Sequence, residues 1–489
     1  MPSALSQIDH IVVVMMENRS FDNLLGFLYA SENNQPPLNL PTQPSPTYAG
    51  LLPQNQSDQF WNPSNRGYFT NGDAPQKVFV SSPTGGQVPF TVPDPDPNEA
   101  FLNFNFQIFG TTEPTNLQSP TMLGFYVDYL DAKNSSPAVA NQIMQCFDPT
   151  QLPVLSALAK QFAVCDAWFG SAPAQTWPNR GFVHTGTSRG QVTNGDVFAY
   201  ATETIYEVLG KKGISWAVFN DSSLPSLTRL QYPRLFSLSE SHFRSFETFQ
   251  SQATAGTLPS YSFVEPSFVY SPNDQHPPHD VSHGENFLFD IWQAISTSPK
   301  WNQTLLVITY DEHGGCYDHV PPPWGATCPD SASNPGQQGF RFDRFGVRVP
   351  TVVVSPLIEP GTVFRSPTAV PHDHTSILAT LRDWKQIPAV DMLSSKRILA
   401  APTLEHLLTR TTPRTDLPII PQPHHEMVMM SASEEHNEPL NELQKSILLA
   451  AESHRLSKPL NVPELMDLFQ RVNTKGAMRQ YFNQWEGKP

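Results

Sequence analysis

The sequence has few cysteines, few cationic residues and no long apolar run. Its four cysteines form no CxxC pair, which argues against a disulfide scaffold and against a zinc–thiolate site. No apolar run approaches the roughly 18 residues of a membrane-spanning helix, so none is expected. Lysine and arginine number 30 against 45 aspartates and glutamates, and the resulting net charge of −15 disfavours binding to nucleic acids or anionic membranes. A neutral lipid headgroup remains compatible with this charge.

The first residues also lack the basic segment of a secretory signal. Strand-like sequence begins as early as Ile8, which leaves no room for one. This predicts a cytoplasmic protein, unless the chain is exported by a route that needs no signal.

The composition predicts one large core with long loops. The chain has 489 residues, 39% of them hydrophobic, and its 49 prolines and 26 glycines are spread along it. Two smaller cores are the alternative. We predict a main domain at residues 1–400, with a proline-rich excursion at about 33–97 that either crosses the active face or is partly disordered. Residues 401–489 are expected to form a helical cover packed on the same domain, with an independent module as the alternative.

Apolar runs alternate with helical patterns along most of the chain, which predicts an α/β fold with a mostly parallel central sheet between helices. Strands are expected at Ile8 to Met16, Gln161 to Phe169, Ile214 to Asn220, Tyr261 to Val264, Leu305 to Thr309 and Val349 to Val354. Helices are expected at Met122 to Tyr129, Leu152 to Ala159, Ile205 to Lys211, Asn286 to Ser296, Thr375 to Leu381, Asn441 to Ala451 and Val462 to Val472.

The stretch from Leu305 to Val320 combines a buried strand with two adjacent carboxylates. Asp311 and Glu312 stand where the strand leaves the sheet, and Gly314-Gly315 allows a sharp turn there. Open α/β sheets bind ligands beyond the carboxyl ends of their strands. Two neighbouring carboxylates destabilise each other unless a cation lies between them, so this is a candidate cation site. A solvated acidic turn is the alternative.

Two other predicted strands are followed by residues that suit the same site. Glu17 and Asn18 follow the first strand and, with Asp311 and Glu312, offer hard oxygen ligands. Thr176 precedes Pro178, which suits the first turn of a helix, and a hydroxyl on a cation can serve as a nucleophile. An ordinary helix cap is the alternative for Thr176.

Asn179 and Arg180 follow Thr176 and are candidates for bracing this turn or holding an anion. Histidines add candidates for proton transfer. His276 and His279 lie in a proline-held loop, where protonation of a leaving group is assigned to His276 with His279 as the second candidate, and binding of a second metal is the alternative. His374 belongs to a His-Asp-His run before a predicted helix, where it either contacts substrate or marks the helix entry.

A group of phenylalanines follows the proline-rich excursion. They are Phe101, Phe104, Phe106 and Phe109. Two alternatives are expected for them: packing in a core or lid, or an apolar rim for acyl chains.

Four segments, in order between Ile8 and Leu381, resemble the signature segments of a known family: the phosphoesterases that include bacterial and plant non-specific phospholipases C and some bacterial acid phosphatases. They are Glu17-Asn18-Arg19-Ser20-Phe21-Asp22, Thr176-Trp177-Pro178-Asn179-Arg180, Asp311-Glu312-His313-Gly314-Gly315 with Asp318-His319-Val320, and Gly346-Val347-Arg348-Val349-Pro350 with Ser355-Pro356.

The resemblance implies an alkaline-phosphatase-like core and a covalent phospho-hydroxyl intermediate. It makes Thr176 the nucleophile and His276 the active-site histidine of the His-Pro loop. Around the metal it places Thr176 with Glu17, Asn18, Asp311 and Glu312. Relatives often carry a histidine in an Asp-Pro-x-His loop, and the stretch from Asp94 to Glu99 is interpreted as offering Asn98 there.

The sequence thus predicts a metal-dependent phosphoesterase, most simply a phospholipase C that releases diacylglycerol and a phosphorylated headgroup. Catalytic roles are assigned to Thr176, His276, His279 and Asn179, and substrate contacts to Asn98, Arg180 and His374. The expected cofactor is a divalent ion, Mg²⁺, Ca²⁺ or Mn²⁺, with zinc as the alternative if histidines join the site. An acid phosphomonoesterase and a non-catalytic headgroup-binding protein are the other functions considered. Peripheral contact with a membrane stays open.

Overall fold

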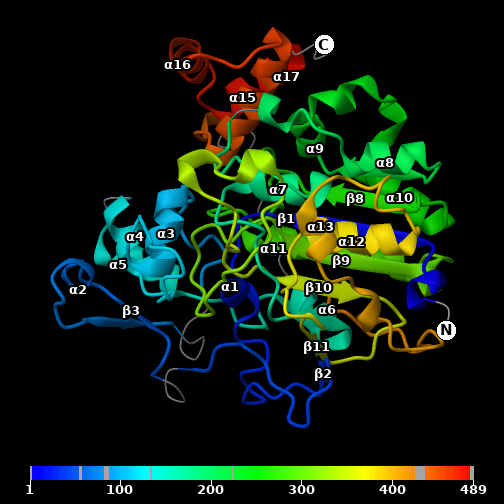
Figure 1. The fold of residues 1–489 in the computed structure, drawn as a ribbon, viewed down its shortest axis with the longest axis horizontal. Helices are drawn as coiled ribbons and strands as arrows, with labels where there is room; N and C mark the ends of the chain where they lie inside the picture. The colour runs from blue at the N-terminus through cyan, green and yellow to red at the C-terminus, as the bar shows by residue number, and fades with distance from the viewer. Residues whose placement is uncertain are drawn as a thin grey trace.

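The computed structural model describes residues 3–53, 58–81, 88–132, 135–195, 197–222, 224–423 and 436–484 (Figure 1). Parts of two predicted segments, the excursion at 33–97 and the tail from 401, lie outside these ranges. Within the described residues, no helix is both long and apolar enough to cross a membrane.

A nine-stranded sheet forms the centre of the fold. β10 pairs antiparallel with both of its neighbours, and all other pairs in this sheet are parallel, which confirms the predicted α/β fold with a mostly parallel sheet. In spatial order the strands are β2 (Leu38–Leu40), β11 (Thr362–Phe364), β5 (Ala163–Cys165), β10 (Thr351–Val354), β9 (Thr304–Tyr310), β1 (His10–Met16), β8 (Tyr261–Glu265), β6 (Trp216–Asn220) and β7 (Phe243–Ser245).

Helices cover both faces of the sheet. Every residue of β1 and β9 is buried, as the continuous apolar runs of these strands predict. The helices of this region are α6 (Pro153–Gln161), α7 (Thr176–Thr185), α8 (Ile205–Lys211), α10 (Phe246–Ala255), α11 (Val281–Ser296), α12 (Thr375–Trp384) and α13 (Lys396–Ala400). α6, α11 and α10 touch in a row, as do α12, α7 and α8.

The excursion at 33–97 contributes to the sheet itself. It supplies the edge strand β2 and a separate two-stranded ribbon of β3 (Trp61–Pro63) and β4 (Lys77–Phe79). These strands were not predicted, because three residues are too few to show an alternating pattern. Short helices also lie outside the sheet layers: α1 (Phe21–Leu25), α2 (Gly67–Thr70), α3 (Phe101–Phe109), α4 (Phe125–Ala132), α5 (Pro137–Ala140) and α9 (Leu227–Gln231).

The last described segment consists of α15 (Glu442–Leu456), α16 (Val462–Arg471) and α17 (Lys475–Gln484). α15 packs on α9, and these three helices lie together at one end of the molecule (Figure 1). Two hydrogen bonds tie α15 to segments of the main domain. The Trp177 indole donates to Ser446 at 2.7 Å, and Gln444 donates to the Phe268 carbonyl at 3.0 Å.

Candidate active site

Two adjacent parallel strands bring four of the predicted residues together. Met16 at the end of β1 pairs with Tyr310 at the end of β9, so the residues that follow both strands leave the sheet side by side. The backbone N–H of Asn18 donates to Asp311 Oδ1 at 3.0 Å. Asn18 has a left-handed backbone, with φ of 51°, which turns the chain sharply at this point. The topology therefore places Glu17-Asn18 against Asp311-Glu312, as predicted.

Thr176 reaches the same group of side chains from another strand. It is the first residue of α7, which begins beyond the end of β5, and it is fully buried. Its hydroxyl Oγ1 lies 3.3 Å from Glu17 Oε2 and 3.4 Å from Asn18 Oδ1. The alternative of an ordinary helix cap does not hold, because the cap position is Gln175. The hydroxyl is instead surrounded by oxygen atoms.

Arg180 and Asn179 lie one turn further along α7 and have different surroundings. Arg180 donates to Glu17 Oε1 from Nε at 2.8 Å and also from Nη2. Asn179 donates to the carbonyls of Ala172 and Ala174 and accepts from the Ala172 N–H at 3.2 Å. Asn179 therefore braces the turn before Thr176, which is one of its two predicted uses. Arg180 orients Glu17, and its Nη1 has no hydrogen-bond partner in the described chain.

The centre of the site carries more negative than positive charge. Burial raises the pKa of Glu17, Asp311 and Glu312 alike, and neighbouring carboxylates raise the pKa of Glu17 and Glu312 further. Arg180 acts in the opposite direction, but it pairs directly with Glu17 alone. Asp311 Oδ2 and Glu312 Oε1 are buried oxygens without a hydrogen-bond partner among the residues described.

Unpaired buried carboxylate oxygens are strongly disfavoured unless a cation binds them. The donor set fits a divalent ion: it offers three carboxylates, the Asn18 amide oxygen and the Thr176 hydroxyl, all oxygen donors as hard cations prefer.

The two histidines of the proline-held loop differ in their partners. His276 is fully buried, its Nδ1 lies 2.6 Å from the Pro277 carbonyl, and burial lowers its pKa to about 4. A carbonyl only accepts, so Nδ1 carries the proton and Nε2 a lone pair. His279 Nδ1 lies 2.6 Å from Asp274 Oδ1. The Asp274 carboxylate therefore fixes the His279 ring through Nδ1, whereas the His276 ring is fixed by a backbone carbonyl.

Asp274 was not among the predicted site residues. Its Oδ1 accepts from the His276 backbone N–H at 3.1 Å as well as from His279. Its backbone carbonyl accepts from the Glu17 N–H at 3.0 Å, which fastens the loop to the end of β1. An aspartate two residues before a histidine in a proline-rich loop was a usable signal for this positioning role.

His374 contacts the site through the backbone of Asp311. Its Nε2 lies 2.6 Å from the Asp311 carbonyl, and the Trp168 indole donates to its Nδ1 at 3.3 Å. Both ring nitrogens are thus engaged, and His374 braces Asp311 rather than offering a free group to a substrate. His374 also stands directly before α12, at its cap position, as the helix-entry interpretation predicts.

The residue that faces the site from the 94–99 loop is Glu99, not Asn98. Asn98 is half-buried, and its carbonyl accepts from Gln107 at 3.1 Å. Glu99 is 6% exposed, accepts from the Asn18 side-chain amide, and has Oε1 3.6 Å from His276 Nε2. Counting the Asp-Pro-x-His spacing from Asp96 reaches residue 99, so the assignment to Asn98 was one position short.

The predicted apolar rim of phenylalanines is wrong, because all four are at most 7% exposed: Phe101, Phe104, Phe106 and Phe109. Phe104 instead packs on His313, with ring centroids 4.3 Å apart. A groove of about 590 Å³ runs along α3, and Arg344 lines it. Leu102 lines the same groove and is 42% exposed, and Leu117, just beyond the groove residue Asn116, is 67% exposed.

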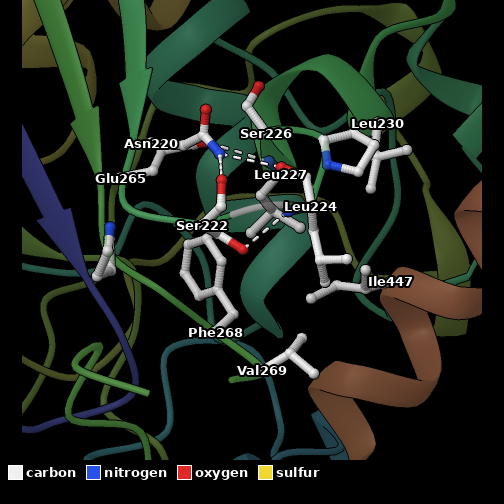
Figure 2. A pocket seen from close by; sticks show the side chains of 12 residues that line it. Asn220, Ser222, Leu224, Ser226, Leu227, Leu230, Glu265, Phe268, Val269 and Ile447 are labelled. Carbon is white, nitrogen blue, oxygen red and sulfur yellow. Dashed lines mark hydrogen bonds between the residues drawn. The ribbon is translucent and has the colours of Figure 1, made fainter. Parts of the chain in front are cut away.

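A second hollow lies beyond the carboxyl ends of β6 and β8, under α15 (Figure 2). Its volume of about 10 Å³ holds about one water molecule, too little for a phosphate ester. Phe268 separates it from the site, because the Phe268 ring also packs 5.3 Å from the Arg180 guanidinium. Other lining side chains shown there are Asn220, Ser222, Leu224, Ser226, Leu227, Leu230, Glu265, Val269 and Ile447.

Comparison with known proteins identifies relatives along most of the chain. The model of the phosphoesterase family matches residues 8–388. Non-specific phospholipase C3 of Arabidopsis thaliana is 34% identical over 470 residues, covering 92% of this chain and 83% of that protein. Non-specific phospholipase C1 of the same plant is 36% identical over 429 residues, covering 84% and 73%. Among solved structures, a protein in the alkaline phosphatase superfamily from Vibrio parahaemolyticus aligns with 12% identity and a TM-score of 0.30, covering 51% of this chain and 64% of that one.

Proposed function

The chain belongs to the phosphoesterase family, whose relatives hydrolyse phosphoric esters, and we propose that it is a metal-dependent phospholipase C with Thr176 as its nucleophile. One observation carries the proposal: the buried Thr176 hydroxyl lies 3.3 to 3.4 Å from Glu17 and Asn18. Beside it, Asp311 and Glu312 each have a buried oxygen without a hydrogen-bond partner among the described residues. The names of the plant relatives favour a phospholipid as the substrate.

The proposed reaction has two displacements at phosphorus. The deprotonated Thr176 oxygen attacks in line, and the bond to the diacylglycerol oxygen breaks, so the headgroup phosphate is transferred to Thr176. The leaving oxygen takes a proton from His279 and departs as the alcohol. Water then attacks the same phosphorus and gives a proton back to His279, the bond to Thr176 Oγ1 breaks to regenerate the deprotonated threonine, and the phosphorylated headgroup leaves. Arg180 holds Glu17 in place throughout, and Asn179 fixes the turn that presents Thr176.

The cation of this site would be held by Glu17, Asn18, Asp311 and Glu312 together with Thr176. When bound, a divalent ion supplies Lewis acidity that lowers the pKa of the threonine hydroxyl and neutralises charge on phosphate oxygens. The unpaired oxygens of Asp311 and Glu312 support this assignment.

Two other functions use the same residues. An acid phosphomonoesterase would transfer a terminal phosphate by the same chemistry, and the exposed Leu102 in the α3 groove and Leu117 beside it favour the lipid substrate over it. A non-catalytic headgroup-binding protein has no need of a buried hydroxyl among four oxygen ligands, and the geometry around Thr176 therefore favours an enzyme.

Product analysis separates these functions. Purified protein is incubated with mixed phospholipids and soluble phosphomonoesters in the presence of Mg²⁺, Ca²⁺, Mn²⁺ or Zn²⁺, and products are identified by mass spectrometry. Diacylglycerol with a phosphorylated headgroup is expected. Inorganic phosphate from monoesters without diacylglycerol would establish the phosphatase instead, and no product with any ion would support the binding protein.

Leu102 and Leu117 are expected to increase the rate of hydrolysis of aggregated lipid. Replacing both by aspartate places charge on the exposed apolar positions beside the groove, so the rate increase at the critical micelle concentration of a short-chain phospholipid should fall about tenfold. Hydrolysis of a soluble ester should stay unchanged. The matched control is Val390→Asp, 88% exposed, whose neighbour Asp391 pairs with Lys212 at the end of α8, across the molecule from α3 (Figure 1). An unchanged micellar response in the double variant would remove this surface from lipid binding.

His279 is expected to protonate the leaving alcohol. His279→Ala should lower turnover of a phospholipid by a factor of about 10² to 10⁴, and turnover of a nitrophenyl ester far less, since nitrophenolate leaves without a proton. His276→Ala serves as the comparison, because its Nε2 carries no proton in this geometry. Equal losses on both substrates in the His279 variant would assign this residue a structural role.

A further inference from the structure

Three ionisable side chains gather next to the proposed catalytic site without belonging to it. Asp96 and Glu99 come from the 94–99 loop, and His276 comes from the proline-held loop after β8. One donor atom from each lies within 4.8 Å of the others. Glu99 and His276 are buried, and the Asp96 side chain is 12% exposed. The cluster is therefore nearly closed to solvent.

The orientation of His276 favours a cation in this cluster. Its Nδ1 donates to the Pro277 carbonyl at 2.6 Å, which leaves the lone pair of Nε2 pointing 3.6 Å from Glu99 Oε1. His276 is fully buried, and Nε2 has no hydrogen-bond partner in the described part of the protein. A lone pair facing a carboxylate oxygen is repulsive, and a cation between the two atoms removes this repulsion.

The charge around Glu99 agrees with this argument. Burial and the charge of Asp96 raise the pKa of Glu99 well above its ordinary value. Arg19 is the basic residue that acts on His276, and Asp274 and His279 are the other ionisable groups that face it. Arg19 donates to the backbone carbonyl of Gln275 and to Asn23, not to a carboxylate of the cluster. Glu99 and His276 thus have no direct ion pair with a lysine or arginine among the described residues.

We propose that Asp96, Glu99 and His276 form a second divalent-cation site. One imidazole nitrogen with two carboxylates suits Zn²⁺ or Mn²⁺, whereas the all-oxygen set around Thr176 suits harder ions. Asp96 Oδ1 lies 3.9 Å from His276 Nδ1, so the Asp96 carboxylate has to turn toward Nε2 to complete the site, because metal–ligand bonds of about 2.1 Å bring donor atoms to within about 4.2 Å of one another.

Asn18 connects the two sites. Its side-chain NH₂ donates to Glu99, and its side-chain oxygen lies 3.4 Å from Thr176 Oγ1. An ion held by Glu99 therefore fixes the orientation of the Asn18 amide, which presents its oxygen to the first site. The inference rests on the proposed function only through this link, because the second site has its own three ligands.

Metal stoichiometry tests the proposal independently of activity. Metal-free protein is titrated with Zn²⁺ and Mn²⁺ and followed by native mass spectrometry and calorimetry. We expect two ions per wild-type chain, and one in Glu99→Gln, with the Kd of the lost site weakened on the order of 100-fold. Asp311→Asn should keep the ion at Glu99 and lose the other. Glu99→His, which restores a donor atom, should recover the second ion, and Asp94→Asn, an exposed carboxylate of the same loop, should bind like wild type.

Each alternative outcome has a definite meaning. One ion in wild type that survives Glu99→Gln and is lost in Asp311→Asn would overturn the second site and leave the proposed function intact. One ion that is lost in Glu99→Gln and survives Asp311→Asn would support the second site and count against the first. Native mass and thermal unfolding of each variant confirm that it is folded, so a lost ion is not a consequence of unfolding.

Discussion

Replacing Thr176 by alanine should reduce kcat/KM by about 10⁴-fold or more. The hydroxyl is fully buried and lies 3.3 Å from Glu17 Oε2 and 3.4 Å from Asn18 Oδ1, so alanine removes the proposed attacking oxygen from the site. A loss of 10⁴ corresponds to about 5.5 kcal/mol of barrier, which is within the range expected for removal of a nucleophile. Steady-state hydrolysis of a soluble ester measures it.

Two further substitutions at this position make the test specific. Thr176→Ser keeps the hydroxyl and loses only a methyl group, so it should retain a substantial part of the activity. Thr176→Val keeps the shape and loses the hydroxyl, so it should be as inactive as alanine. A Thr176 peptide that carries the headgroup phosphate, trapped by rapid quenching in acid and detected by mass spectrometry, is expected in the parent, and the matching serine adduct in Thr176→Ser, but no adduct in the alanine and valine variants. Activity of Thr176→Ala within tenfold of the parent would show that this residue is not the nucleophile.

The centre of the site was predictable because parallel strands order it. Glu17 and Asp311 each follow a continuous apolar run, and such runs become buried parallel strands whose carboxyl ends share an edge. Thr176 could be added because Pro178 marks the first turn of a helix. These inferences need only the ends of strands and helices, which periodicity and proline indicate from the sequence.

The residues supplied by loops could not be placed in the same way. The spacing from Asp96 reaches Glu99, but the role of Glu99 follows from its contact with Asn18, which is distant in sequence. The same limit applies to His374, whose ring nitrogens are engaged by Trp168 and Asp311, far from it in the sequence. The sequence motifs indicated which residue types lie near the site, but tertiary contacts determine which of their atoms are free to bind a substrate or a metal.

The charge balance of the site explains why stability and activity should respond oppositely to some substitutions. Buried carboxylates without a counter-ion destabilise the folded chain, and Arg180 pairs directly with one of them, Glu17. In the metal-free protein the remaining carboxylates therefore favour unfolding, and bound metal reverses that effect because it binds the folded state alone. A substitution that removes one of these carboxylate charges should therefore stabilise the metal-free protein and reduce the stabilisation by metal.

Asp311→Asn should make the metal-free protein more stable and the metal-loaded protein nearly inactive. Asparagine keeps an oxygen in the position of Asp311 Oδ1, which accepts from the Asn18 N–H at 3.0 Å, and removes a negative charge whose pKa burial raises. A group with a raised carboxyl pKa in the folded state opposes folding when it is ionised at neutral pH, so its neutral replacement raises Tm in chelator. Activity should fall by 10³-fold or more, because a ligand of the cation is lost.

Thermal unfolding with and without metal measures the stability effect directly. In wild type, a cation at 100 times its Kd adds about 2.7 kcal/mol to the free energy of unfolding, and this gain should be largely absent for the first site in Asp311→Asn. Asp166→Asn is the matched control, since Asp166 is a buried carboxylate paired with Arg365 at 2.7 Å, and its loss should lower Tm whether or not metal is present. If Asp311→Asn lowers Tm in chelator as Asp166→Asn does, Asp311 is a structural carboxylate and the cation site centred on it is wrong.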